Sequence, residues 1–154
     1  MDIGTGGSRA VIIGADGEVL SSSIVEHVAF ASPRIGWAEQ SPEDWWRASC
    51  EAIRAALKSS GVDPSEIGAL SFSGQMHGSV LLDESDQVLR PALLWCDQRT
   101  ADEVVEITET IGATRLIELV SNPAVTGFIL PKLLIEFGFL SHPQAKSLPG
   151  TCGT

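Results

Sequence analysis

The sequence predicts an α/β fold, a mixed sheet with an N-terminal β-hairpin and flanking helices. Three observations predict it. Two runs of strand-forming residues, 9–13 and 19–27, are joined by Asp16-Gly17, a pair that closes tight hairpin turns. A helical pattern follows over residues 42–60, and a short apolar run at 67–73 then indicates a buried strand. A strand, a helix and a further strand in this order indicate a parallel crossover.

Length and composition indicate one globular domain. Of the 154 residues, 44% are hydrophobic and 19% are charged, as in globular rather than disordered proteins. The net charge of −10 argues against a nucleic-acid partner, and no apolar run reaches the ~18 residues of a membrane span. The three cysteines show neither metal-ligand nor disulfide spacing, so we expect a cytoplasmic protein.

Near the start of the chain, Asp2 precedes a glycine-rich turn at residues 4–7. Glycines let the backbone approach a ligand closely, and successive N–H groups in such a turn can bind an anion. The Thr5 hydroxyl adds a donor. Phosphate would repel the Asp2 carboxylate, but that carboxylate can hold Mg²⁺ that bridges to phosphate. Two interpretations stay open, a nucleotide–magnesium site and a plain hairpin with a carboxylate at its foot.

Capping residues predict where the helices begin and end. Ser41 can cap the first helix, Pro42 suits its first position and Gly61 its C-cap. Thr100 and Glu103 form a capping-box pattern that opens a helix ending near residue 111. Two more helices are expected at 114–121 and from Pro131 onward. Between the first two helices we expect strands at 79–83, 88–89 and 92–95.

Residues 74–78 follow the predicted strand 67–73, and ligands bind beyond the carboxyl ends of parallel strands. Gln75 offers a donor and an acceptor, Met76 an adaptable apolar surface, and His77 a donor–acceptor pair. This mixture suits a polyhydroxylated ligand, although His77 could equally be a structural turn residue. A second polar cluster follows the apolar run 92–95, where Asp97 either pairs with Arg99 or faces the ligand cleft.

Six blocks, in the same order over residues 1 to about 135, resemble the FGGY carbohydrate kinases. The order Gln-Met-His is similar to the xylulokinase branch rather than the glycerol kinase branch. The blocks are Asp2-Ile3-Gly4-Thr5, Gly36-Trp37-Ala38-Glu39-Gln40, Pro42-Glu43-Asp44-Trp45-Trp46, Gly74-Gln75-Met76-His77-Gly78, Pro91-Ala92-Leu93-Leu94-Trp95, and Asn122-Pro123 through Gly127-Phe128 to Pro131-Lys132-Leu133-Leu134.

The resemblance implies an actin-like, ribonuclease-H-like fold that transfers the γ-phosphoryl group of ATP to a ketose, here D-xylulose, with Mg²⁺. It implies that Asp2 lies beside the metal and the phosphates. The phosphate loop would be Gly4, Thr5 and Gly6, and the sugar-binding pair would be Met76 and His77. We add Gln75 and Asp97 to the predicted sugar-binding residues.

Departures from the family pattern predict an incomplete kinase domain at residues 1–143, an irregular tail at 144–154 and no second domain. The family's general-base aspartate would lie beyond residue 154, so we assign no catalytic residue and expect the chain alone to be inactive. A single domain would expose a face, which predicts self-association or a homodimer. Two alternatives are a non-catalytic sugar- or nucleotide-binding remnant and a ribonuclease-H-like nuclease. The net charge and the Gln-Met-His turn count against the nuclease.

Overall fold

The computed structural model describes residues 1–141. They form two compact units, each described by itself. The first unit contains Met1–Ala29 and Ser41–Gln75, and the second contains Phe30–Gln40 and the chain from Met76 onward. The predicted tail at 144–154 lies outside the described residues.

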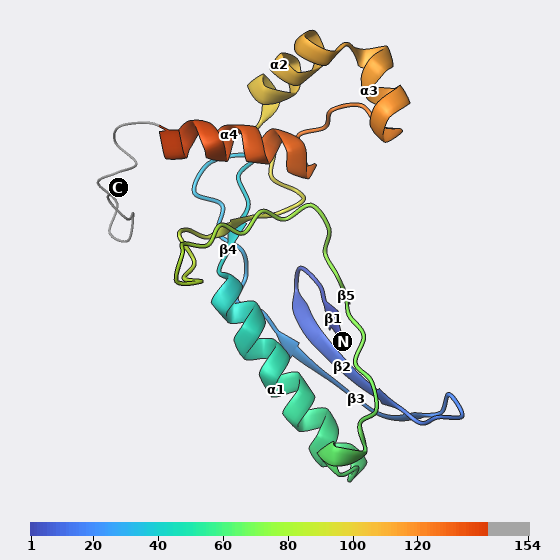
Figure 1. Cartoon of the computed structure of the whole chain (residues 1–154). Coiled ribbons are helices and arrows are strands. Elements are labelled where there is room, and N and C mark those ends of the chain that lie inside the picture. The colour runs from blue at the N-terminus through green and yellow to red at the C-terminus, as the bar shows by residue number, and fades with distance from the viewer. Residues whose placement is uncertain (142–154) are drawn as a thin grey trace. The chain divides into compact units, whose positions relative to one another are not determined.

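The first unit is a four-stranded mixed sheet with one long helix on it (Figure 1). The sheet order is β3-β2-β1-β5, with β1 antiparallel to β2, β2 antiparallel to β3, and β5 parallel to β1. The predicted hairpin and parallel crossover are therefore confirmed. The strands are β1 Asp2–Ile3, β2 Gly7–Ile13, β3 Val19–Glu26 and β5 Ser73–Gly74.

Helix α1, Pro42–Ser60, packs on β2 and β3 through a stripe of alanines. Ala48, Ala52 and Ala56 are fully buried, and such small side chains let the helix backbone approach the sheet closely. The helix ends as predicted at Gly61, which takes a left-handed φ of 69°. The predicted Ser41 cap is wrong in one respect, because the Ser41 hydroxyl donates to the Glu43 carboxylate instead of accepting from a helix N–H.

The predicted buried strand at 67–73 is wrong in length and in burial. Only Ser73–Gly74 pairs with β1, and residues 67–74 are exposed. The preceding residues join β1 only at its start, where the Met1 ammonium donates to the Ser71 carbonyl. Residues 67–70 pair with no strand within residues 1–141, and Ile67 and Leu70 are exposed.

The second unit pairs a small sheet with three helices, α2 Ala101–Ile111, α3 Ala113–Val120 and α4 Ile129–Ser141. The sheet consists of β4 Glu39–Gln40 antiparallel to β6 Ala92–Leu93. Isolated bridges, such as Leu82 with Val88, replace the predicted strands at 79–83 and 88–89. The Thr100 capping box is also wrong, because the Thr100 hydroxyl donates to the Thr126 carbonyl. None of the helices within residues 1–141 combines the length and apolar character needed to cross a bilayer.

Candidate functional site

The turn between β1 and β2 presents backbone donors at the start of the first unit. The Gly4 N–H donates to the Gly7 carbonyl at 3.0 Å, and the His27 N–H donates to the Gly6 carbonyl at 3.0 Å, so the turn is closed from both sides. The Gly6 N–H has no acceptor within residues 1–141. A Cβ added at Gly6 would meet nothing within 4 Å. The turn therefore leaves one N–H accessible to an anion.

Asp2 lies on β1 beside this turn, with its side chain exposed. Its Oδ1 accepts a hydrogen bond from the Ser73 hydroxyl at 2.7 Å, which orients the carboxylate. No partner for Oδ2 exists within the described chain. Residues 1–141 hold no cluster of three or more His, Cys, Asp or Glu that could bind a metal. A lone carboxylate fits Mg²⁺ that is bound mainly through nucleotide phosphates and water.

Gln75 connects the turn to the strand that follows α1. Its backbone N–H donates to the Ile3 carbonyl at 2.9 Å, and its Oε1 accepts from the Thr5 hydroxyl at 3.0 Å. Its Nε2 is buried and has no hydrogen-bond partner in the part of the chain described. Gly74 permits this close approach, since a Cβ there would lie 2.8 Å from the Ile3 carbonyl oxygen. Asp2, Gly4, Thr5, Gly6 and Gln75 are thus together in the first unit.

Met76 and His77 belong to the second unit, so the predicted sugar turn runs across the boundary between units. Met76 is 72% exposed. His77 takes a left-handed φ of 60°, uncommon for a residue with a side chain. Its ring stacks on Phe128 at 4.1 Å between centroids, and its ring nitrogens form no hydrogen bond with the described residues. The pair offers a donor–acceptor group beside an apolar surface.

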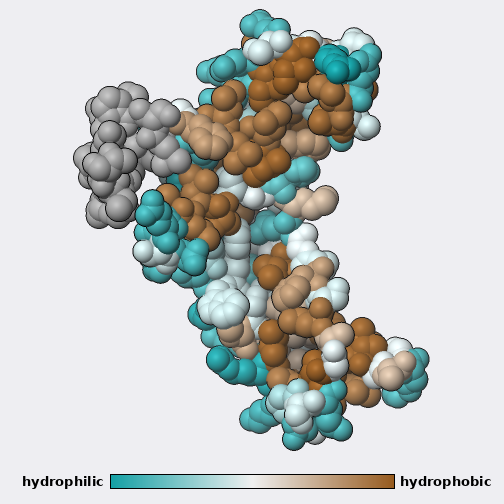
Figure 2. All heavy atoms as spheres, in the orientation of Figure 1, coloured by the Kyte–Doolittle hydropathy of each residue, from teal (hydrophilic) through white to brown (hydrophobic). Residues whose placement is uncertain are grey.

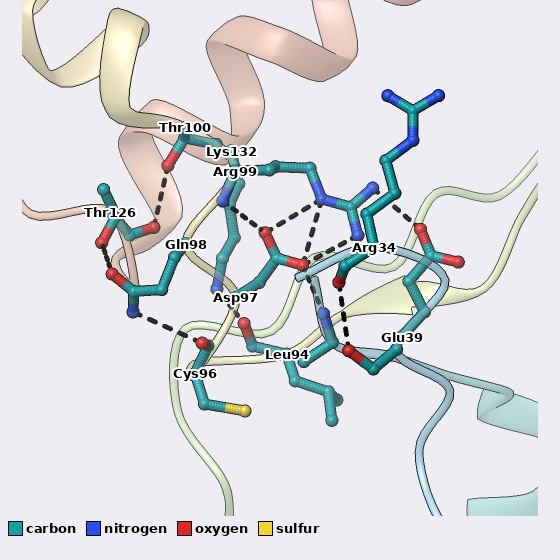
Figure 3. Close-up of polar contacts among 12 residues, drawn as sticks. Arg34, Glu39, Leu94, Cys96, Asp97, Gln98, Arg99, Thr100, Thr126 and Lys132 are labelled. Carbon is teal, nitrogen blue, oxygen red and sulfur yellow. Dashed lines mark hydrogen bonds and ion pairs between the residues drawn. The ribbon is translucent and has the colours of Figure 1, made fainter. Parts of the chain in front are cut away.

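Asp97 is fully buried and pairs with Arg99 (Figure 3). Arg99 donates to both carboxylate oxygens at 2.8–3.0 Å, and the Ala38 N–H donates to Oδ2 at 2.7 Å. Burial alone would raise the pKa of the Asp97 carboxyl, but the bonds from Arg99 and Ala38 and the Arg99 charge hold that pKa below its ordinary value. The carboxylate therefore faces protein partners in this structure.

The Asp97–Arg99 pair belongs to a charge network of the second unit. Arg99 bonds Glu39 at 2.8 Å and lies 3.7 Å from the centre of the Trp37 ring. Arg90 bridges Glu39 and Glu136 at 3.1 and 3.3 Å. Burial raises the pKa of Glu136, while Arg90 opposes that rise. Alternating charges let β4, the segment after β6 and α4 share one polar interior.

Three residues of these sites escaped the sequence prediction. Ser73 orients Asp2, Phe128 stacks on His77, and Lys132 donates to the His77 carbonyl. The one available signal was at Lys132, a single cation inside the apolar run at 130–135, because such a charge is buried only with partners. The other two depend on contacts between distant segments.

The chain is similar in sequence to bacterial xylulose kinases. It is 37% identical over 134 residues to the xylulose kinase of Bacillus subtilis (strain 168), covering 87% of this chain and 26% of that protein. It is 40% identical to the xylulose kinase of Klebsiella pneumoniae, covering 87% and 27%. The chain thus spans about a quarter of the length of these curated relatives.

Solved structures and a family model agree with this likeness. A xyloylose kinase from Brucella ovis matches with a TM-score of 0.82 and 32% identity, over 94% of this chain and 29% of that one. The xylulose kinase from Rhodospirillum rubrum matches with a TM-score of 0.82 and 26% identity, over 99% of this chain and 31% of that one. The expected actin-like fold is therefore confirmed. The model of the N-terminal domain of the FGGY family matches residues 1–134, so the chain belongs to the FGGY family of carbohydrate kinases.

Proposed function

We propose that this chain supplies the sugar- and phosphate-binding part of an ATP-dependent kinase that phosphorylates D-xylulose. The observation that carries the proposal is the pair Met76 and His77. Neither ring nitrogen of His77 has a hydrogen-bond partner within residues 1–141, and the ring is stacked on Phe128 beside an exposed Met76. These groups match the hydroxyls and C–H faces of a ketose. The relatives that share this part of the chain are named xylulose kinases.

The first unit would hold the nucleotide. The accessible Gly6 N–H is a donor for phosphate oxygens. The Gln75 Nε2, which has no hydrogen-bond partner within residues 1–141, stays a proposed donor for the ketose. Asp2, oriented by Ser73, would hold Mg²⁺ through its second oxygen. When bound, the magnesium nucleotide supplies the phosphoryl group and neutralises its charge. The residues of this chain bind and orient, and none is assigned as the base.

For Asp97 we favour the alternative in which it pairs with Arg99. Contact with a sugar hydroxyl would require breaking hydrogen bonds to Arg99 and Ala38 inside a buried site. Breaking one side of a buried ion pair costs about 3–5 kcal/mol, more than a single sugar hydrogen bond returns. The predicted sugar contact of Asp97 would therefore be indirect. We further infer that residues 1–143 form one kinase domain, and that the protein is cytoplasmic.

A chimera tests the proposal. Residues 1–134 of this chain replace the matching 134 residues of the Bacillus subtilis xylulose kinase, and a coupled assay measures ADP formation with D-xylulose. We expect turnover within about tenfold of the parent enzyme, while the 154-residue chain alone shows none. Loss of a general base by itself lowers the rate about 10²–10⁴-fold. A folded chimera that binds neither D-xylulose nor the magnesium nucleotide in calorimetry would contradict the proposal.

The second candidate is a non-catalytic sugar- or nucleotide-binding protein. It is favoured by the binding groups of Met76, His77 and the Gly6 N–H, while none of the described residues is assigned as the base. Calorimetry with D-xylulose on the 154-residue chain helps to distinguish the kinase from the binding protein. Binding of D-xylulose by the chain, combined with an inactive chimera, would support the binding protein and count against the kinase.

A further inference from the structure

Lys132 is the largest fully buried side chain of the described residues. It lies on α4, its side chain is fully buried, and its ammonium donates to three backbone carbonyls. These belong to His77 at 2.6 Å, Leu94 at 2.7 Å and Gly127 at 2.8 Å. Figure 3 shows the side chain directed at the Leu94 carbonyl. An ammonium group has three donors, so all three are used.

Carbonyl dipoles rather than a carboxylate compensate this charge. No acidic side chain within residues 1–141 lies within ion-pair distance of the Lys132 ammonium. Burying an ion costs several kcal/mol even after relaxation, and an apolar side chain would avoid that cost. A purely apolar replacement, however, would leave three carbonyls without a donor. The ammonium thus fixes the peptide groups that it contacts.

Two of those three peptide groups flank the ring stack of the proposed sugar site. One is the carbonyl of His77 itself, held in its left-handed conformation. The other, at Gly127, belongs to the peptide bond that leads into Phe128, on which the His77 ring stacks. Gly127 packs closely against Trp95, since a Cβ there would lie 2.3 Å from the Trp95 carbonyl oxygen. One ammonium therefore sets the backbone under both rings.

We propose that Lys132 is a positioning residue for the sugar site, and that its ammonium sets the direction in which the His77 imidazole presents its nitrogens to the ketose. The inference rests on the proposed function for its ligand. The hydrogen bonds of Lys132 go to backbone carbonyls and not to either ring, so it acts through the two carbonyls. Removing its donors releases the His77 peptide and the Phe128 peptide together.

If Lys132 positions the sugar site, sugar affinity should depend on the protonation state of Lys132 and therefore on pH. Burial lowers the pKa of the ammonium to about 8, which Asp97 and Cys96 oppose and Arg99 reinforces. Glu136 also lies on α4, four residues after Lys132, and pairs with Arg90. A neutral amine has two N–H donors, so above about pH 8 one of the three carbonyls loses its donor. Sugar affinity should then fall as the pH rises through about 8.

The test uses the full 154-residue chain and D-xylulose. Calorimetry compares wild type, Lys132→Met, His77→Ala and the double variant, with Lys58→Met as an exposed lysine control. We expect Lys132→Met to weaken binding about tenfold, which corresponds to about 1.4 kcal/mol. The double variant should lose no more than His77→Ala, because Lys132 acts through His77. Additive losses, or unchanged affinity in Lys132→Met, would overturn the proposal.

A second measurement needs no sugar. Nuclear magnetic resonance follows the Lys132 Cε carbon and the Phe128 ring protons of the wild-type chain from pH 7 to pH 10. We expect both to move with one midpoint near 8, and the Phe128 transition to vanish in Lys132→Met. Ring signals that stay flat through the lysine transition would overturn the inference, and the wild-type data decide this even if the variant fails to fold. Absence of any D-xylulose binding by wild type would contradict the proposed function alone.

Discussion

The His77 imidazole is the group on which the proposed sugar site depends most directly. In the chimera, His77→Ala should weaken D-xylulose binding about tenfold or more and leave the magnesium nucleotide little affected. A neutral hydrogen bond contributes about 0.5–1.5 kcal/mol, and a buried partner left unpaired costs about 1–3 kcal/mol. Calorimetry with each ligand separately measures both affinities.

Two variants control this prediction. Asp86 is exposed and also has a φ of 60°, so Asp86→Ala reproduces the backbone strain without touching the site and should bind D-xylulose normally. Asp2→Asn should show the opposite pattern, with normal sugar affinity and impaired use of the magnesium nucleotide. Unchanged kcat/KM for D-xylulose in His77→Ala would show that the histidine is a structural turn residue.

Lys132 should also make the stability of the chain depend on pH. Its pKa is about 8 in the folded state and 10.5 ordinarily, so between these values the unfolded chain binds more protons. Stability then rises with pH across that window, because deprotonation relieves the buried charge. Urea unfolding at pH 7.5 and 9.5 should show the wild type gaining relative to Lys132→Met. A constant difference between the two proteins would mean that Lys132 does not titrate there.

The ion pairs of the second unit differ widely in burial. Arg99 is 4% exposed and bonds Asp97 and Glu39, whereas Arg115 on α3 is 61% exposed and bonds Glu118. Arg99→Met should cost about 3–5 kcal/mol of unfolding free energy, because it strands a buried carboxylate. Arg115→Met is the matched control and should cost less than about 1 kcal/mol. Equal losses in urea unfolding would argue against the buried network.

The low pKa of Asp97 also predicts how the stability of the chain changes with pH. Because that pKa lies below its ordinary value of 3.8 in the folded state, the Asp97 carboxylate stabilises the fold above pH 3.8. That contribution is lost as the pH falls below 3.8 toward the folded pKa. Arg99→Met should therefore be less sensitive to acid than wild type over this range.

Two glycines, one just before α4 and one inside it, should have opposite effects on stability when alanine replaces them. Gly127, just before α4, has its Cβ position 2.3 Å from the Trp95 carbonyl oxygen, while Gly138 inside α4 has nothing within 4 Å. Gly127→Ala should destabilise the chain by about 1–3 kcal/mol through overpacking. Gly138→Ala should stabilise it by about 0.5–1 kcal/mol, since alanine favours a helix. Thermal or urea unfolding checks both, and a neutral Gly127→Ala would contradict the close approach.

For the molecule as a whole, exposed apolar side chains predict self-association. On the first unit, Leu70 and Phe72 are 62% and 64% exposed, and on α3 Leu119 and Val120 are 56% and 58% exposed. Figure 2 shows apolar side chains gathered over α2 and α3. Large exposed apolar patches promote association.

Sedimentation velocity across a range of concentrations measures this. We expect the chain to associate with itself, and Leu70→Ser combined with Phe72→Ser to shift it toward the monomer. A wild-type chain that sediments as a monomer at every concentration would contradict the prediction.

The sequence by itself determined the features that depend on neighbouring residues. Asp16-Gly17 closed the hairpin, and Pro42 and Gly61 bounded α1, because turn and cap preferences act within a few residues. Six short blocks in the same order, from Asp2 to Leu134, were together enough to indicate the family. These signals need no knowledge of what packs against them.

Only the tertiary structure decided where distant segments meet. Residues 67–73 have the apolar pattern of a buried strand, yet within the described chain only Ser73 among them pairs with β1. The sequence allowed Asp97 either to pair with Arg99 or to face the ligand cleft. The hydrogen bond from the Ala38 N–H, 59 residues away, favours the pair with Arg99. Lys132 reaches a carbonyl 55 residues away. Local propensity carries no information about such contacts, because their free energy comes from burial and from convergence of groups that only the folded chain brings together.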